Sequence, residues 1–386
     1  MKKIKSLKKV DLKNKRVLVR VDFDVPIDEK GNVLDNFRIK NSLETIKYLI
    51  KQKAKIILIS HLGRPRGEKN SKMSLKPIVE ELGKLLNKKI LFSNDILGKR
   101  IEDKIKKMEY GDILLLENIR FWADEEKNSS EFAEKLARLG NVYVNEAFAN
   151  SHREHASIVG IPKFLPSTAG FVLEREIQEL NKILNNPERP LVAIIGGAKM
   201  ETKIKVINKF LRIADKVLIG GASANTIFAS QGISMGESII DKDSFSEIKK
   251  INLNNPKLFL PVDLGIWDGK SVVYKDVTPL EWYEKALDIG PKTIHLFNDL
   301  VLKSKMVIWN GPLGLTNQKP FDMASRKLIE SIDKSNAYAV VGGGDTIAFI
   351  NEIGKNKVFD WMSTGGGAML DYLSNGTLPG IEALRG

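Results

Sequence analysis

The sequence contains no cysteine among its 386 residues. This excludes disulfide bonds and thiolate chemistry, and it is compatible with a reducing compartment. No apolar run approaches the roughly 20 residues that a membrane-spanning helix needs. The basic start, Met1-Lys2-Lys3-Ile4-Lys5, is not followed by the apolar core of a secretory signal. We therefore expect a cytoplasmic protein that does not bind membranes.

Two common nucleotide-binding motifs are also missing. The sequence has no G-x-x-x-x-G-K-[ST] motif, and no G-x-G-x-x-G motif follows its first expected strand. The former is the phosphate loop of many ATPases and GTPases, and the latter is the dinucleotide fingerprint of dehydrogenases. Their absence argues against both classes, although a nicotinamide-dependent dehydrogenase remains the main rival among two-domain α/β enzymes.

The charge is strongly positive, with 61 Lys and Arg residues, 48 Asp and Glu residues, and a net charge of +13. Abundant lysine on solvated helix faces would explain this value, and so would an anionic partner. The basic residues are scattered and form no arginine-aromatic tract of the kind that single-strand binders use. We expect no nucleic acid among the partners, and we keep a non-enzymatic nucleic-acid binder as an alternative.

The length and the hydrophobic pattern predict two α/β domains. A chain of 386 residues exceeds one ordinary core. Short β-branched apolar runs, typical of strands buried on both faces, alternate with helix-length segments, which favours parallel sheets. The expected strands are residues 16–21, 55–59, 112–116, 141–144, 191–195, 216–219, 257–261, 306–309, 338–341 and 357–361, and expected helices include 39–51, 75–86 and 130–139.

A helix is expected at residues 168–184, before Asn185-Asn186-Pro187, because proline disfavours helix in the residue that precedes it. We interpret it as an interdomain connector with a hinge near its ends, and an ordinary surface helix is the alternative. The expected domains are residues 1–168 and 186–370, joined by 169–185, with a C-terminal tail at 371–386 that packs on the first domain.

Arginines and histidines follow the expected strands of the first half. Ligands of open parallel sheets lie beyond the carboxyl ends of the strands. Guanidinium groups bind phosphate and carboxylate through paired hydrogen bonds. The residues in question are Asp22, Asp24, Arg38, His61, Gly63, Arg64, Arg120, His152 and Arg153. We infer a site for a small anion with several charges; separate ion pairs for each arginine, or a metal site at His61 and His152, are the alternatives.

Glycines replace the arginines at the strand ends of the second half. They let the backbone approach a phosphate, and the amides of the next helix then bind the anion. The clusters are residues 196–199, 220–221, 310–312, 342–346 and 363–367. Lys199 and Lys203 lie one helical turn apart and could face the same phosphates. Asp345 is the best-placed carboxylate for a nucleotide-bound Mg²⁺.

These motifs together resemble one family, the phosphoglycerate kinases. Residues 20–26 read RVDFDVP, 60–65 SHLGRP, 115–121 LLENIRF and 145–157 NEAFANSHREHAS. Residues 196–204 read GGAKMETKI, 309–314 WNGPLG, 342–346 GGGDT and 363–368 STGGGA. They occur in the family's order from near residue 16 to the C-terminus, so the resemblance covers the whole chain.

The resemblance implies two Rossmann-like parallel-sheet domains that face each other across a cleft, and a monomer. It implies reversible transfer of the acyl phosphate of 1,3-bisphosphoglycerate to ADP, giving 3-phosphoglycerate and ATP in glycolysis or gluconeogenesis, with Mg²⁺ and direct in-line transfer after hinge closure. The phosphoglycerate ligands would be Asp22, Phe23, Asp24, Arg38, His61, Leu62, Gly63, Arg64, Arg120 and Arg153. The nucleotide ligands would be Gly197, Lys199, Lys203, Gly221, Gly290, Asn310, Gly311, Asn317, Gly343, Gly344, Asp345 and Thr346. Catalysis would use Arg38, Lys199 and the amides near Gly343 and Gly366.

Three positions depart from the family pattern. Asp24 replaces an asparagine and adds negative charge beside an anionic substrate. Asn317 replaces the glutamate that binds the nucleotide ribose, and Met369 stands where a different residue often follows the STGGGA motif. These changes bear on substrate affinity and nucleotide preference, and they raise the alternative of a family member that has lost activity.

Overall fold

The computed structural model describes residues 4–385. Its contacts divide the chain into two compact units: unit 1 comprises Met1–Gln178 with Thr377–Gly386, and unit 2 comprises Glu179–Gly376. Residues 1–3 and 386, which belong to the expected first domain and tail, lie outside the described residues. Within residues 4–385, no helix combines the length and the apolar character that crossing a membrane requires.

Unit 1 is built on a six-stranded sheet in the spatial order β3-β4-β2-β1-β5-β6, and neighbouring strands are parallel. Both faces of such a sheet are covered, which explains the nearly continuous apolar runs. The strands are β1 (Arg16–Arg20), β2 (Lys55–Ile59), β3 (Leu91–Ser93), β4 (Ile113–Leu116), β5 (Val142–Asn145) and β6 (Ser167–Ala169).

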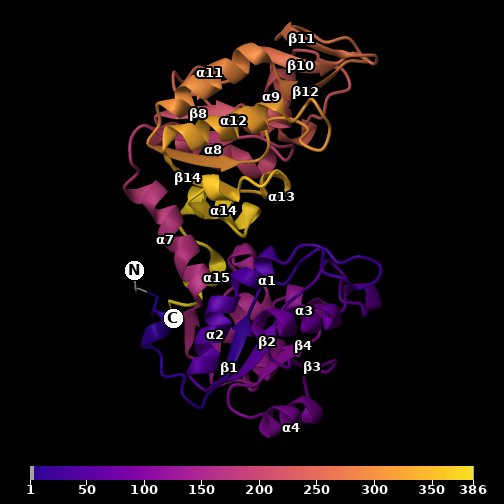
Figure 1. The fold of residues 1–386 in the computed structure, drawn as a ribbon, viewed down its shortest axis with the longest axis vertical. Coiled ribbons are helices and arrows are strands. Elements are labelled where there is room, and N and C mark those ends of the chain that lie inside the picture. The colour runs from indigo at the N-terminus through magenta and orange to yellow at the C-terminus, as the bar shows by residue number, and fades with distance from the viewer. Residues whose placement is uncertain (1–3, 386) are drawn as a thin grey trace. The chain divides into compact units, whose positions relative to one another are not determined.

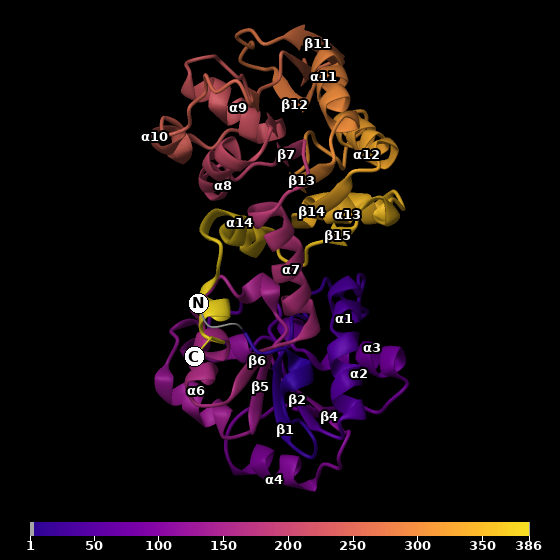
Figure 2. The ribbon, with the colours of Figure 1, turned by 90° about the vertical axis from the view of Figure 1, so that its left-hand side faces the viewer.

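Helices cover the two faces of this sheet, with α6 on one side and α2 and α3 on the other (Figure 2). The α-helices of unit 1 are α1 (Phe37–Asn41), α2 (Leu43–Lys51), α3 (Lys76–Leu86), α4 (Lys99–Lys107), α5 (Ala123–Glu126), α6 (Ser130–Ala137) and α15 (Pro379–Glu382). Short 3₁₀ helices are η1 (Leu7–Lys9), η2 (Ser71–Met73), η3 (Ile119–Phe121), η4 (Phe148–Asn150) and η6 (Ile161–Lys163), and η5 (Ala156–Gly160) is a π-helix.

Local sequence sets the ends of α3 in a simple way. Pro77 occupies its first turn, where a missing backbone N–H costs nothing. Ile78 and Leu82, four residues apart, are buried against the sheet. Asn87 ends the helix in the left-handed conformation at φ +49°.

Unit 2 repeats this plan with the order β15-β14-β13-β7-β8-β9, again with parallel neighbours. Helices α8 and α9 lie on one side of the sheet and α11 and α12 on the other (Figure 2). The strands are β7 (Leu191–Ile195), β8 (Lys216–Ile219), β9 (Leu258–Phe259), β13 (Met306–Asn310), β14 (Tyr338–Gly342) and β15 (Trp361–Met362). The helices are α8 (Glu201–Ile213), α9 (Gly221–Ser230), α10 (Phe245–Ile248), α11 (Pro291–Leu302), α12 (Met323–Ser335), α13 (Gly344–Glu352) and α14 (Gly366–Asn375), with 3₁₀ helices η7 (Lys242–Ser244) and η8 (Asn356–Val358).

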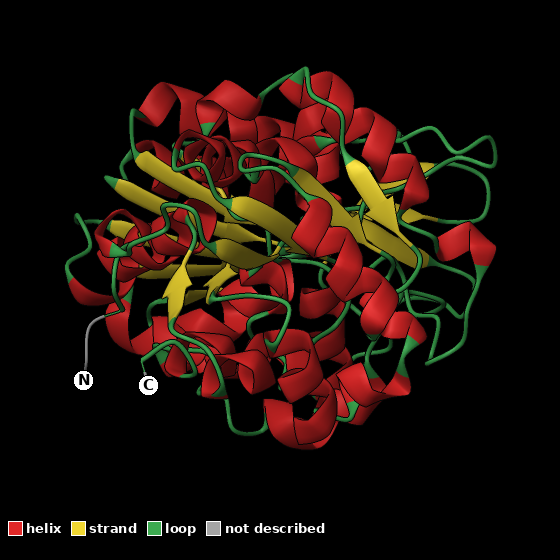
Figure 3. Ribbon diagram, turned by 90° about the horizontal axis from the view of Figure 1, so that it is seen from below, coloured by secondary structure: helices red, strands yellow, loops and turns green. Residues whose placement is uncertain are grey.

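The two six-stranded parallel sheets confirm the predicted α/β class, and Figure 3 shows the strands lying among helices. Unit 2 also has an antiparallel three-stranded sheet in the order β11-β10-β12, which the sequence analysis did not predict. It comprises β10 (Asp263–Trp267), β11 (Val272–Asp276) and β12 (Lys285–Ile289), in orange beside α9 and α11 in Figure 1.

Three local predictions were wrong. The expected strand at 357–361 is divided between η8 and β15, so its first residues form a 3₁₀ turn. Thr168 lies in β6 and not in the connector helix. The tail does not separate at residue 371, because α14 continues to Asn375 within unit 2 and the segment assigned to unit 1 starts at Thr377.

The connector helix α7 (Phe171–Asn185) has contacts in both units. At its start, the backbone N–H of Phe171 donates to Thr45 Oγ1 in unit 1 at 2.9 Å. Near its end, Lys182 Nζ donates to the Tyr338 hydroxyl in unit 2 at 3.0 Å. The division between the units falls within the helix, between Gln178 and Glu179. We keep the connector role of residues 169–185 as a proposal.

Each sheet has one topological switch point, where later strands of the chain lie on both sides of the same strand. In unit 1, β1 pairs with β2 on one side and with β5 on the other. In unit 2, β7 pairs with β8 on one side and with β13 on the other. Ligands of open α/β sheets bind beyond the strand carboxyl ends at such switch points. The loops that follow these strands are therefore where a ligand site is expected.

Candidate functional site

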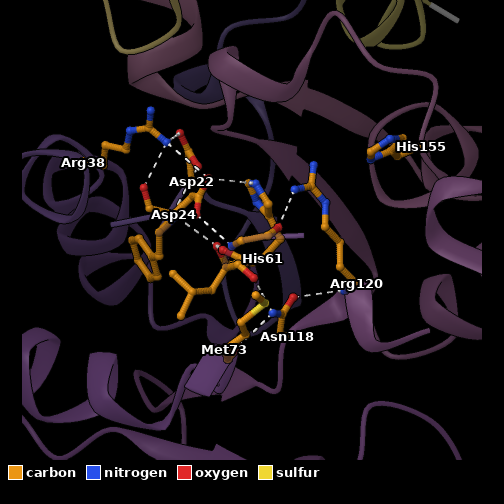
Figure 4. Close-up of polar contacts among 12 residues, drawn as sticks. Asp22, Asp24, Arg38, His61, Met73, Asn118, Arg120 and His155 are labelled. Carbon is orange, nitrogen blue, oxygen red and sulfur yellow. Dashed lines mark hydrogen bonds and ion pairs between the residues drawn. The ribbon is translucent and has the colours of Figure 1, made fainter. Parts of the chain in front are cut away.

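In unit 1, two aspartates follow β1 and contact the guanidinium of Arg38 from α1. Arg38 Nη1 lies 3.0 Å from a carboxylate oxygen of Asp22 and 4.0 Å from one of Asp24, and it donates to the Asp24 carbonyl at 3.1 Å. Figure 4 shows these three residues converging next to His61. Asp22 is buried, whereas the side chain of Arg38 is one-third exposed, so this guanidinium can also reach a ligand from solvent.

His61 follows β2 and is buried between a cation and an anion. Its Nδ1 lies 3.3 Å from Arg20 Nη2, and its Nε2 lies 3.5 Å from a carboxylate oxygen of Asp24. Because a guanidinium can only donate, Nδ1 accepts and the proton is on Nε2, facing Asp24. Burial, together with the charges of Arg20 and Arg120, lowers the pKa of His61 to about 4. His61 is therefore a neutral hydrogen-bond donor at pH 7.

Asp24 is held by donors from three directions. Although burial alone raises its pKa, the hydrogen bond from His61, the backbone N–H of Gly63 at 2.9 Å and the charge of Arg38 keep the pKa well below its usual range. Asp24 is thus a carboxylate at any pH near neutrality. An asparagine could accept the same Gly63 bond without the charge.

Arg120, from η3, lies on the other side of His61 (Figure 4). Its Nη1 donates to the Gly63 carbonyl at 2.8 Å, and its Nε lies 3.3 Å from a Glu126 carboxylate oxygen. The Asn118 side chain, just before it, donates to the Leu62 carbonyl at 2.7 Å and thereby fixes the loop after β2. These bonds join the loops that follow β2 and β4.

Nearby arginines act on two titratable groups of this region, Arg120 and His155. Burial and the charges of Arg20 and Arg153 lower the pKa of Arg120 to about 10, which still leaves it protonated at pH 7. Burial and the charges of Arg120, Arg20 and Arg153 likewise lower the pKa of His155 to about 3. Guanidinium groups that repel one another in this way favour a bound anion with several charges.

The other predicted residues of unit 1 are Phe23, Arg64 and Arg153. Phe23 is buried and its backbone N–H donates to Ser60 Oγ at 2.9 Å. Arg64 is exposed beside Gly63, and its guanidinium makes no hydrogen bond or ion pair with another residue of the described chain. Arg153 is half-buried, and its charge acts on Arg120 and His155. The alternative metal site at His61 and His152 finds no support, because residues 4–385 hold no group of three or more potential metal-binding side chains.

One central residue, Arg20, was not predicted from the sequence. This last residue of β1 is fully buried, and its Nε donates to Ser157 Oγ at 2.8 Å while its Nη2 faces His61. The buried Glu125 carboxylate accepts from the same Ser157 hydroxyl at 2.6 Å and from its backbone N–H at 2.8 Å. A charged residue at the end of an otherwise apolar strand was the only signal in the sequence.

In unit 2, the loops after β7 and β13 approach so closely that only glycine fits. A Cβ on Gly311, where φ is +88°, would lie 2.2 Å from the Gly196 carbonyl oxygen. The backbone N–H of Gly197 donates to the Pro312 carbonyl at 2.9 Å, which ties the two loops together. A Cβ on Gly221 would lie 2.9 Å from the same carbonyl. At the switch point of this sheet, the loops thus expose backbone atoms without side chains at these glycines.

Two further glycine loops meet beside them. A Cβ on Gly366 would lie 2.8 Å from the Gly343 Cα, so the loops that precede α13 and α14 touch. Thr346 Oγ1 and Asn310 Nδ2 are buried there, and neither has a hydrogen-bond partner among the described residues. They lie 3.5 and 3.7 Å from the position of a Cβ on Gly343. Buried donors without partners indicate a ligand with oxygen acceptors.

Lysines complete this site. Lys203, on α8, is buried, its Nζ donates to the Lys199 carbonyl at 3.2 Å, and that Nζ lies 3.3 Å from where a Cβ on Gly197 would be. Burial lowers its pKa to about 8, despite the opposing charges of Asp345 and Asp241. Lys199 is exposed in the loop after β7, and Asp345 is exposed in the first turn of α13. An ammonium near glycine loops and a helix start is suited to phosphate.

Two adjoining cavities lie next to these loops. The first, of about 160 Å³, has mostly small and apolar walls, lined by Gly197, Ala198, Gly221, Ala222, Asn225, Ile239, Ala286, Leu287, Pro312, Gly314, Leu315 and Asp345. The second, of about 390 Å³, is lined by Pro312, Gly314, Leu315, Thr316, Asn317, Asp345, Ala348, Phe349 and Glu352. Gly290 lines neither cavity; it precedes α11, where a Cβ would lie 2.3 Å from an Asp263 carboxylate that accepts from the Thr293 N–H. Its role in nucleotide binding stays a prediction.

Comparisons with known proteins agree with this geometry. A family model described as phosphoglycerate kinase matches residues 7–376. Curated proteins named phosphoglycerate kinase include one from Pelotomaculum thermopropionicum, 41% identical with 98% of each chain covered, and one from Pseudothermotoga lettingae, 42% identical with 100% of this chain and 99% of the relative covered.

Solved structures give the same result. The structure of phosphoglycerate kinase from Coxiella burnetii is 34% identical, covers 99% of both chains and superposes with a TM-score of 0.85. That from Pyrococcus horikoshii is 31% identical, covers 98% of both chains and has a TM-score of 0.87. With a guanidinium site in unit 1, a glycine-loop site in unit 2 and similarity over nearly its whole length, this chain belongs to the phosphoglycerate kinase family.

Proposed function

We propose that unit 1 binds the phosphoglycerate and unit 2 binds the nucleotide in the reaction of this family. A member of the family is a phosphotransferase, and its reaction is the reversible transfer of the acyl phosphate of 1,3-bisphosphoglycerate to ADP, which gives 3-phosphoglycerate and ATP in glycolysis. The observation that carries the assignment of sites is the contrast at the two switch points. Guanidinium groups of Arg20, Arg120 and Arg153 lie close enough to act on one another in unit 1, and the buried donors of Asn310 and Thr346 lie without partners beside glycine loops in unit 2.

In unit 1, the phosphate and carboxylate of the substrate would replace internal partners of the arginines. Arg38 would turn from Asp22 toward the ligand, and Arg64, which has no partner among the described residues, would bind it directly. Arg120 and Arg153 would supply further charge. His61 would donate through Nε2, and the loops at Asp22–Asp24 and Leu62–Gly63, with Phe23 buried beneath, would shape the pocket.

In unit 2, the nucleotide phosphates would receive hydrogen bonds from Asn310, Thr346 and the amides of Gly343 and Gly344. The Lys203 ammonium, close to Gly197 and Gly311, would form ion pairs with the nucleotide phosphates. The first cavity, with Gly221 in its wall, has the apolar surface that a purine base needs.

A nucleotide-bound Mg²⁺ fits the residues that are present. Asp345 offers an exposed carboxylate in the first turn of α13, beside the buried Thr346 hydroxyl. Mg²⁺ typically uses one or two carboxylates together with phosphate oxygens. When bound, the ion would neutralise charge on the phosphates, and Asp345 would hold it.

For the transfer itself, the chain would supply position and charge. Lys199, Arg38 and the amides near Gly343 and Gly366 would stabilise the oxygens of the phosphoryl group in flight. No general base is needed, because the accepting carboxylate of 3-phosphoglycerate is already ionised at neutral pH. The two reactants would bind to different units, so both units must reach the phosphoryl group during transfer. We propose that bending near the ends of α7 allows this. The same movement would exclude water from the reacting groups.

The remaining assignments follow from this reaction. The substrates are small molecules, so no nucleic acid or membrane partner is required. A single chain carries both proposed sites, which supports a monomer. The absence of cysteine and the use of ADP and ATP support a cytoplasmic location.

A coupled assay of ATP with 3-phosphoglycerate and Mg²⁺ tests the reaction. We expect steady formation of 1,3-bisphosphoglycerate that requires all three components. An otherwise folded protein that shows no turnover, with Asp24→Asn equally inactive, would favour a family member that has lost activity.

A further inference from the structure

Helix α13 presents one continuous face to the second cavity of unit 2. Asp345, Ala348 and Glu352 all line this cavity. Their spacing of three and four residues places them on one side of the helix. Asp345 and Glu352, seven residues apart, are separated by about 10 Å along the helix axis. A ligand that contacts Asp345 through its phosphates can therefore extend toward Glu352.

The loop that follows β13 also lines this cavity. Thr316 and Asn317 contribute hydrogen-bonding side chains to it, and Pro312, Gly314, Leu315 and Asp345 are shared with the first cavity. The two cavities thus share part of their lining. The first offers small apolar walls, and the second offers two side chains with amide or carboxylate groups in addition to Asp345.

The Glu352 carboxylate is available to a ligand. The residue is exposed, and its side chain makes no hydrogen bond or ion pair with any other residue between 4 and 385. A carboxylate accepts strong hydrogen bonds from hydroxyl groups, whereas the Asn317 amide can both donate to a hydroxyl and accept from it. A pair of neighbouring hydroxyl groups satisfies both side chains at once.

We propose that Glu352, together with Asn317, binds the ribose hydroxyls of the nucleotide and makes this chain selective for ribonucleotides. The proposal rests on the assignment of unit 2 as the nucleotide site. The base occupies the first cavity, the phosphates lie at the glycine loops near Asp345, and the sugar lies in the second cavity. Glu352 supplies the charged acceptor that Asn317 lacks.

Calorimetric binding of ADP, 2′-deoxy-ADP and 3′-deoxy-ADP to the full chain, each with Mg²⁺, tests this proposal. For the wild type, we expect removal of one hydroxyl to weaken binding about 10-fold, as for a hydrogen bond to a charged group. For Glu352→Gln, ADP should bind about 10-fold more weakly. The deoxy analogue that binds about 10-fold more weakly than ADP to the wild type should then bind the variant within about 2-fold of ADP. In turnover, KM for ATP should rise while kcat stays within about 2-fold.

A second variant and a control sharpen the result. Asn317→Glu in the Glu352→Gln background should restore discrimination, because it returns a carboxylate to the same cavity. Glu330→Gln removes an equivalent charge from α12, where Glu330 is paired with Lys327 at 2.9 Å outside both cavities, and should change nothing. Equal weakening of ADP and both deoxy analogues by Glu352→Gln, or no weakening at all, would overturn the role of Glu352 while leaving the nucleotide site intact. Failure of the wild type to bind ADP would instead refute the nucleotide site itself, and this inference with it.

Discussion

The Nε2 atom of His61 lies 3.5 Å from a carboxylate oxygen of Asp24, and the Nδ1 atom of the same ring faces Arg20. This arrangement holds a neutral histidine between a buried cation and an anion, and it fixes which ring nitrogen carries the proton. It also places a negative charge beside a site that we propose binds a multiply charged anion.

Asp24→Asn should therefore tighten phosphoglycerate binding. The asparagine keeps an oxygen for the Gly63 N–H but removes the charge, and we expect a roughly 3- to 10-fold lower Kd at low salt, a gap that narrows as salt screens the charge. Titration with 3-phosphoglycerate at two ionic strengths measures this. Weaker binding by the variant would mean that the carboxylate organises the arginines more than it repels the ligand.

Acidification should narrow the stability difference between the wild type and His61→Gln. The pKa of His61 is about 4 in the folded chain against 6.5 for an ordinary histidine, so the unfolded chain takes up the proton first as the pH falls. This costs the wild type stability between those two values, and the variant has no such cost. We expect its deficit at pH 7 to shrink by about 2–3 kcal/mol at pH 4.5.

Urea denaturation at the two pH values provides the comparison, and the difference between the two proteins removes the contributions of titrating groups that do not interact with residue 61. A deficit that stays constant between pH 7 and pH 4.5 would contradict the depressed pKa of His61.

Nucleotide binding at pH 8 should be accompanied by proton uptake at Lys203. Its pKa of about 8 leaves the group about half protonated at that pH, and neighbouring phosphates would favour the charged form and raise the pKa. Calorimetry in buffers of different ionisation enthalpy should show uptake of about half a proton at pH 8 and little at pH 6.5.

Lys203→Met should lose this uptake and bind ADP more weakly. Lys203→Arg, which stays charged throughout this range, should lose the uptake even if it still binds. Undiminished uptake in both variants would assign the proton to another group.

Lys199→Ala should reduce turnover strongly while leaving phosphoglycerate affinity nearly intact. Lys199 is exposed in the loop after β7, and we propose that it contacts the phosphoryl group only during transfer. We expect a loss of roughly 10²-fold or more in the single-turnover rate, as for other groups that stabilise transferring charge. An unimpaired transfer rate would reject this role.

Gly311→Ala should destabilise unit 2 and abolish nucleotide binding. At φ +88° the new Cβ would lie 2.2 Å from the backbone oxygen of Gly196, which cannot move without breaking the loop. We expect a loss of at least about 2 kcal/mol in unfolding free energy. For the stability measurement, Gly344→Ala is the matched control, because no atom lies within 4 Å of its Cβ position. Equal thermal stability of the two variants would contradict the close contact of the loops.

Most residues of the candidate site could be predicted from the sequence, because polar residues follow directly after the expected strands. Polar residues directly after apolar runs, such as Asp22 and His61, are brought to one sheet edge by any parallel sheet. The glycine clusters were recognisable for a similar reason, since repeated glycine at strand ends has few other uses. Asn317 likewise stands out against the family pattern, and it lines the second cavity; its role as a nucleotide ligand stays a prediction.

Other elements could not be predicted because their residues lack a clear period. The strand β11 (Val272–Asp276) is half-exposed and carries Lys275, whose partner Glu284 is nine residues away. The run at 357–361 is too short to distinguish a strand from a turn by its pattern alone. The sequence also did not show how deeply each arginine of β1 is buried. Arg20, at the carboxyl end of the strand, became the buried partner of His61, whereas Arg16, at the amino end, is only partly buried.

The sequence by itself determined the α/β class, the order of the chemical groups along the chain and the family, because these depend on periodicity and motifs that are local. Only the tertiary structure decided which charges are buried together, which His61 nitrogen carries a proton, and that Glu352 shares a cavity with Asn317. Those properties depend on distance and solvent exclusion between segments far apart in the chain, and local sequence carries no information about either.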